Sequence, residues 1–176
     1  MLLFIRRYLA LAGLLFWLGG FTFYAAVVVP IGQEVLGSHF EQGMITRQVT
    51  QYLNWSAALA LLPLAWDGAA AHDPSSRRRL ARWLSWAGML LSLGVLVWLH
   101  PRLDALLDVD QRRILERQAF RASHRWYLWL STIQWACGLI YLGLSLLTWR
   151  AEDRAGAKAS FREPTCQARL RKPTKN

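Results

Sequence analysis

Residues 126–149 read WYLWLSTIQWACGLIYLGLSLLTW and contain no Asp, Glu, Lys or Arg. A helix of this length rises about 36 Å, which exceeds the roughly 30 Å hydrocarbon thickness of a bilayer. A charge at the middle of a bilayer costs at least about 2.5 kcal/mol, so an uncharged stretch this long is typical of a segment whose solvent is lipid. The stretch therefore predicts a membrane-spanning α-helix.

Three further stretches, residues 8–33, 48–66 and 83–101, also contain no charged side chain, so all the charges of the 176-residue chain lie between or outside the four stretches. Hydrophobic residues make up 54% of the chain, yet its formal net charge is +10. We expect an all-α protein, an integral membrane four-helix bundle formed by residues 1–150. The predicted spans cover about residues 8–30, 48–66, 83–100 and 126–149.

Lys and Arg are distributed unevenly over the connections. Residues 1–7, 67–82 and 150–176 together carry 14 of the 21 Lys and Arg, and residues 34–47 and 102–125 carry the other 7. An excess of Lys and Arg marks the cytoplasmic side of a membrane protein. The counts predict an N-in/C-in topology in a bacterial inner membrane, with both termini cytoplasmic.

The connections suggest further local structure. Pro30 and Gly32 are expected to end the first helix, Pro101 the third, and residues 67–74 to form a turn. An amphipathic external helix is predicted between spans 3 and 4, because apolar side chains recur there at helical spacing among charges. These apolar residues are Leu103, Leu106, Leu107, Ile114 and Leu115. Residues 151–176 are basic and lack periodicity, which predicts a disordered cytoplasmic tail.

Polar and small side chains on the fourth span recur at alternating steps of three and four, which places them on one face of the helix. Polar groups in hydrocarbon need partners, so this face must meet other helices. We expect a polar stripe inside the bundle, which consists of Asn54, Ser92, Tyr127, Ser131, Gln134, Tyr141 and Ser145. The stripe either holds the helices together or lines a polar path or ligand pocket.

Three of the four histidines, His39, His100 and His124, fall on the predicted outer side, and Asp104 follows His100 by four residues. Imidazole and carboxylate groups bind zinc or copper, so these four residues are candidate metal ligands. His100 and His124 also stand at similar depth on consecutive helices, where two histidines could hold a haem. In the leading interpretation, however, the histidines cap helix ends or pair with carboxylates, and there is no cofactor.

No nucleotide-binding loop, nucleophile elbow or HExxH motif appears in the sequence. The leading hypothesis is a non-enzymatic accessory or interaction component that lies in the bilayer beside a membrane protein partner or a second copy of itself. Nucleic acid is not an expected partner, because attraction to anionic lipid headgroups explains the basic tail. The alternatives are a metal- or haem-binding redox or metal-handling protein and, third, a small transporter or channel. The spans contain no carboxylate, which disfavours the transporter.

Two segments resemble a known family. The run from Leu18 through Tyr24, with Val27 to Pro30, is similar to the first helix of the small four-span membrane proteins grouped as a transmembrane domain of unknown function, which includes drug-resistance-associated transmembrane proteins. Phe120 to His124, with Thr132 and Gln134, is similar to the entry to that family's last helix. The resemblance covers about a third of the chain. It implies a four-span architecture and assigns no catalytic residue.

Overall fold

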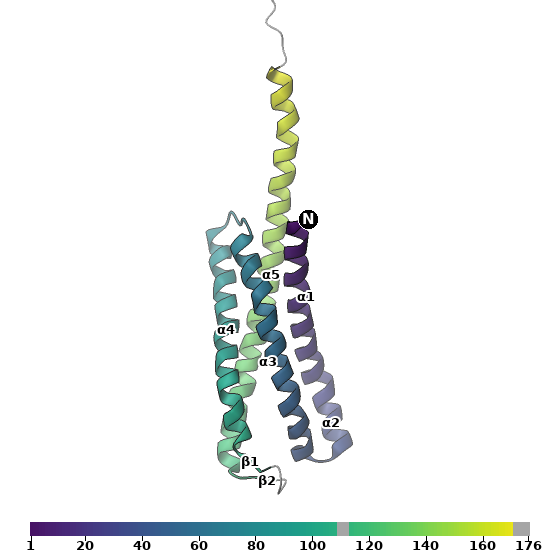
Figure 1. The fold of residues 1–176 in the computed structure, drawn as a ribbon, viewed down its shortest axis with the longest axis vertical. Coiled ribbons are helices and arrows are strands. Elements are labelled where there is room, and N and C mark those ends of the chain that lie inside the picture. The colour runs from purple at the N-terminus through teal and green to yellow at the C-terminus, as the bar shows by residue number, and fades with distance from the viewer. Residues whose placement is uncertain (109–112, 171–176) are drawn as a thin grey trace, which may run out of the picture.

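The computed structural model describes residues 1–108 and 113–170, and for His39, Arg113 and residues 159–170 it describes the backbone alone. Helices dominate the described chain. The elements in order are α1 (Leu2–Phe23), the π-helix η1 (Tyr24–Val28), α2 (Val29–Leu36), α3 (His39–Ala70), α4 (Ser76–Asp104), β1 (Leu107–Asp108), β2 (Arg113–Ile114) and α5 (Arg117–Leu170). Figure 1 shows α1 with α2, α3, α4 and α5 standing side by side, and α5 continuing well beyond the others.

Three helical segments are long and apolar enough to cross a membrane, namely Leu2–Leu36, Ser76–Asp104 and Arg117–Lys158. The predicted second span lies in α3, which is not among them. Its first half is less apolar than the other three segments, because it carries Thr46, Gln48, Thr50, Gln51 and Asn54.

The exterior of the bundle is apolar and its interior contains polar groups. Phe16 and Leu91 are 75% and 70% exposed, whereas Gln134 on the inner face of α5 is only 3% exposed. Water-soluble proteins bury their large apolar side chains and expose their amides. Large apolar side chains on the outside together with a buried amide are typical of a bundle surrounded by lipid.

The helices form a ring in which α1 contacts α3 and α5, and α4 contacts the same two helices from the other side. Glycine permits close approach at the α1–α5 contact. A Cβ atom at Gly138 would lie 2.8 Å from the Trp17 ring and 3.0 Å from the Leu18 side chain. Because Gly138 has no side chain, the Trp17 ring fits between the two helices.

The prediction that the first helix ends at Pro30 is wrong. Proline lacks the backbone N–H that an α-helix needs, and the hydrogen-bond ladder changes to the π pattern in the turn before it, η1. The helix then continues as α2 and ends at Gly37, whose φ of 60° suits glycine. Pro101 likewise does not end its helix, because its carbonyl still accepts a hydrogen bond from Ala105 N at 3.0 Å.

The predicted amphipathic external helix is also wrong for the described residues. The chain turns after α4 and forms an antiparallel pair, in which Leu107 of β1 faces Ile114 of β2. Both side chains line a pocket inside the end of the bundle. Their apolar character therefore reflects burial against the helices, which the spacing alone cannot distinguish from an apolar face on a membrane surface.

Two further expectations differ from the structure. Residues 67–70 belong to the last turn of α3, and the connection to α4 is limited to residues 71–75. Helix α5 continues to Leu170 through much of the tail that was predicted to be disordered. At its start this extension is held by Glu152 and Asp153, which pair with arginines of α1.

Candidate functional site: a pocket at one end of the bundle

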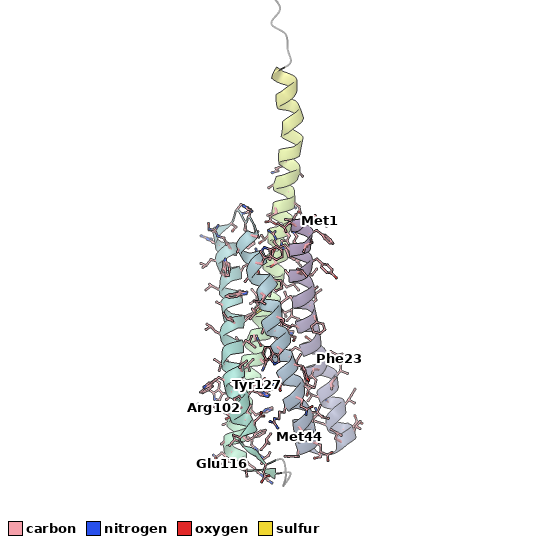
Figure 2. All side chains as sticks on the ribbon, in the orientation of Figure 1. Met1, Phe23, Met44, Arg102, Glu116 and Tyr127 are labelled. Carbon is pink, nitrogen blue, oxygen red and sulfur yellow. The ribbon has the colours of Figure 1, made fainter. Side chains whose placement is uncertain are left out.

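The two ends of the bundle differ in their chemistry. The ion-pair end, beside Met1, contains charged side chains in mutual contact: Arg6, Arg7, Asp67, Asp73, Arg78, Arg82, Glu152 and Asp153. The pocket end contains the β1–β2 hairpin and the start of α5. In Figure 2, Met1 marks the first end, and Met44 and Glu116 mark the second.

A pocket of about 520 Å³ opens at the pocket end between η1, α3, α4, the hairpin and α5. Its volume falls within the range of about 300–1,000 Å³ that is typical of small-molecule sites. Most of the lining is apolar or aromatic. The aromatic lining residues are Phe21, Tyr24, Phe40, Phe120 and Tyr127, joined by Leu53, Leu103, Leu107, Ile114 and Leu128.

Charged groups form a small cluster on the pocket wall. Arg47 Nε of α3 lies 2.8 Å from Asp104 Oδ1 at the end of α4. The other oxygen of Asp104 lies 3.7 Å from His100 Nε2, one helical turn earlier. The carboxylate thus balances the charge of the guanidinium.

Two tyrosine hydroxyls are fixed by hydrogen bonds beside the pocket. Asn54 Nδ2 donates to the Tyr127 hydroxyl at 3.1 Å, and the Tyr24 hydroxyl donates to Thr46 Oγ1 at 2.8 Å. Tyr24 lies in η1, so the π-helix directs this ring toward α3. Single π-helical turns are frequent at functional sites, because they re-aim side chains within an otherwise regular helix.

His124 is available for interaction with a ligand. Its ring stacks on Phe120 with a centroid separation of 5.9 Å. Within the part of the chain that the structure describes, its two ring nitrogens make no hydrogen bond or ion pair. An imidazole that lines a pocket in this way can donate from one nitrogen and accept at the other.

The structure brings three of the four candidate metal ligands to one place. His100, Asp104 and His124 line the pocket, whereas the side chain of His39 lies outside the described residues. No group of three or more His, Cys, Asp or Glu side chains among the described residues could hold a metal ion. The donor set also fits a cation poorly, because Asp104 already pairs with the positively charged Arg47.

Most of the polar stripe connects helices. Ser92, Tyr127, Ser131, Gln134, Tyr141 and Ser145 are buried, and Asn54 is partly buried. The Tyr141 hydroxyl donates to Leu64 O of α3 at 2.6 Å, and Gln134 Nε2 lies 3.5 Å from Met89 O of α4. Only Tyr127 and Ser131 of this set line the pocket, and the hydrogen bonds of the set that cross between helices involve Asn54 with Tyr127, Gln134 and Tyr141.

The ion-pair end was not predicted. Asp67 has no exposed surface, and its Oδ2 accepts a hydrogen bond from Arg82 Nη2 at 2.6 Å. Arg6 Nε lies 3.0 Å from Oδ1, but its N–H does not point at the oxygen, so this contact is an ion pair without a hydrogen bond. Trp149 Nε1 donates to the same carboxylate. A sequence signal existed, because Asp67 directly follows one span and Arg82 directly precedes the next.

A second ionic contact orders the connection between α3 and α4. Arg78 Nε donates to Asp73 Oδ2 at 2.6 Å, and Thr148 of α5 donates to the same oxygen at 2.8 Å. The hydrogen bonds from Arg78 lower the pKa of the Asp73 carboxyl to about 2. The connection is thereby tied to α5.

No family model, no curated protein and no solved structure matches the chain. The resemblance to the four-span family therefore stays a prediction.

Proposed function

We propose that the protein is a four-span inner-membrane bundle, with both termini cytoplasmic, that binds a small apolar molecule in the pocket at its pocket end. Its role is that of a non-enzymatic accessory or interaction component. The pocket is the observation that carries this proposal, because it combines an apolar aromatic lining with a few polar groups, the usual composition of a small-molecule site.

Several contacts support α3 as a membrane span in addition to the three long apolar segments. Its 32 residues rise about 48 Å, and it packs between α1 and α4, two of the helices with enough apolar length to cross a membrane. The polar Asn54 bonds to Tyr127 inside the bundle. Leu59 and Leu62 of the same helix are exposed on its outer face, as expected for lipid contact.

Two glycines provide a matched test of the pocket. Gly43 lines the pocket and Gly19 of α1 does not, and a Cβ at either position would meet no atom within 4 Å. We expect Gly43→Leu to weaken saturable binding of 2-methylnaphthalene to protein in lipid nanodiscs by about tenfold or more, because the added side chain competes for pocket volume. Gly19→Leu should leave binding unchanged. Equal binding by both variants would exclude the proposed site.

Haem binding is the second candidate, and it is supported by His100 and His124 lining the same pocket. A Soret band that appears when haem is added to the purified protein and shifts in His100→Ala and His124→Ala would support this function. If neither substitution changes the spectrum, the two histidines do not ligate haem.

A further inference from the structure

The chemistry of the pocket lining restricts what the pocket can hold, if it binds a small molecule as proposed above. We infer that its ligand is a flat, uncharged ring that carries carbonyl oxygens, the chemistry of a quinone, and that this ligand enters sideways from the lipid between η1 and α5. The inference rests on the shape of the walls, the charge balance of the polar cluster, the free hydrogen-bond donors and the position of the opening.

The shape of the ligand follows from the walls. Aromatic side chains reach the pocket from α1, η1, α3 and α5, namely Phe21, Tyr24, Phe40, Phe120 and Tyr127. Aromatic rings contact one another best in offset-stacked or edge-to-face arrangements. Walls built from rings on several elements therefore suit a flat ring better than a flexible acyl chain, which has no face to stack.

The charge of the ligand follows from the polar cluster. Arg47 and Asp104 neutralise each other at 2.8 Å, and Asp104 also faces His100. Burying an anion or a cation beside this neutral set would require a further opposite charge, since an uncompensated buried charge is strongly unfavourable. An uncharged molecule requires none.

The hydrogen-bonding groups of the ligand follow from the free donors. Arg47 uses its Nε toward Asp104, and in the described part of the chain its two terminal nitrogens have no hydrogen-bond partner. A guanidinium donates and never accepts, and His124 can donate from one of its ring nitrogens. Free donors on α3 and α5 therefore match a ring with acceptor oxygens, and carbonyl groups supply these.

The route of entry follows from the α1–α5 contact. Trp135 Nε1 of α5 donates to Thr22 Oγ1 of α1 at 3.0 Å, which joins the two helices beside the pocket. Within two turns of this contact, Ala25 of η1 and Leu128 and Thr132 of α5 line the pocket and are also exposed. These residues lie within predicted spans, so the opening faces lipid, and a lipid-soluble ligand reaches it without crossing water.

A matched pair of probes tests the inference. 2-Methyl-1,4-naphthoquinone and 2-methylnaphthalene share a ring skeleton and differ in the two carbonyl oxygens. Calorimetric titration into nanodiscs that contain the protein, corrected for partitioning into empty nanodiscs, should show the quinone binding about tenfold more tightly. The expected factor corresponds to one or two hydrogen bonds of typical net strength.

Two substitutions assign the preference to residues. Arg47→Lys keeps the charge pair with Asp104 but loses the planar fork of donors, and His124→Phe keeps the ring that stacks on Phe120. Each should lower the preference for the quinone over the hydrocarbon about fivefold, and circular dichroism shows whether the variant is folded. Arg102→Lys is the control, because Arg102 stacks on Trp98 away from the pocket lining.

The outcomes separate the two proposals. Equal affinity for the two probes, or a preference that survives both substitutions, overturns the inference about a quinone while the pocket itself remains a binding site. Saturable binding of neither probe overturns the proposed function. A preference for the quinone that is lost in Arg47→Lys and His124→Phe and kept in Arg102→Lys supports both.

Discussion

At the ion-pair end Asp67 is fully buried between Arg6 and Arg82, whereas at the pocket end the Asp104 side chain is 22% exposed beside Arg47. Both sites pair a carboxylate with arginine from another helix. The first lies among contacts that join α1, α3, α4 and α5 and exclude solvent. The second forms one wall of a 520 Å³ pocket. Similar ion pairs thus lie in different surroundings: residues of four helices enclose Asp67, whereas Asp104 borders a pocket.

The largest expected effect on stability is at Asp67, and it should exceed the effect of the same substitution at Asp104. Asp67→Asn leaves the buried guanidinium groups of Arg6 and Arg82 without their shared countercharge, so we expect a loss of about 3–5 kcal/mol in the free energy of unfolding. The matched change Asp104→Asn, at a partly exposed pair, should cost no more than about 1 kcal/mol. Thermal unfolding in detergent, followed by circular dichroism, measures both. Equal losses would show that the two ends do not differ as described.

Acid should weaken the ion-pair end through Asp73. The pKa of this carboxyl is lowered from 3.8 to about 2, so its contribution to stability is present above pH 3.8 and is lost as the pH falls toward 2. The shift corresponds to about 2 kcal/mol. The difference in stability between the unmodified protein and Asp73→Asn should therefore shrink over this pH window, as measured by thermal unfolding between pH 6 and pH 2. A constant difference would contradict the assignment.

The α1–α5 contact between the two ends can be loosened sterically. Gly138→Ala places a Cβ 2.8 Å from the Trp17 ring. The overpacking costs about 1–3 kcal/mol and the better helix propensity of alanine returns up to about 1 kcal/mol, so we expect a net loss of about 1 kcal/mol. Gly143→Ala is the control, because its Cβ would meet no atom within 4 Å. Unfolding in detergent should rank the control as the more stable of the two variants.

The smallest expected effect concerns the contact beside the opening of the pocket. Trp135→Phe removes the hydrogen bond to Thr22 and should cost about 0.5–1 kcal/mol. Because this contact is next to the pocket opening and far from Asp67, the substitution should speed exchange of a pocket ligand without changing the acid response of the ion-pair end. Unchanged ligand dissociation rates would place the opening elsewhere.

More of the fold than of the candidate site could be predicted from the sequence. The helical character of the chain and the buried face of α5 follow from the absence of charge and from the spacing of polar residues. The hairpin could not be predicted, because the helical spacing of Leu107 and Ile114 is compatible with an amphipathic helix and only their contact with the bundle shows otherwise. The pocket itself was not predicted. His100, Asp104 and His124, which line it, are candidate metal or haem ligands by residue type, but Arg47 is not among the candidates, because its partner is 57 positions away in the chain.

The sequence by itself determined the predominantly helical character, the long apolar helices and the face of α5 that is buried, since hydrogen bonding and solvation act on each segment alone. The tertiary structure decided which charges meet. Arg6, Asp67 and Arg82 are separated in the sequence and become one buried cluster only when three helices align. It also decided where space remains, because a pocket forms where helices separate, and their separation depends on how all the side chains pack together.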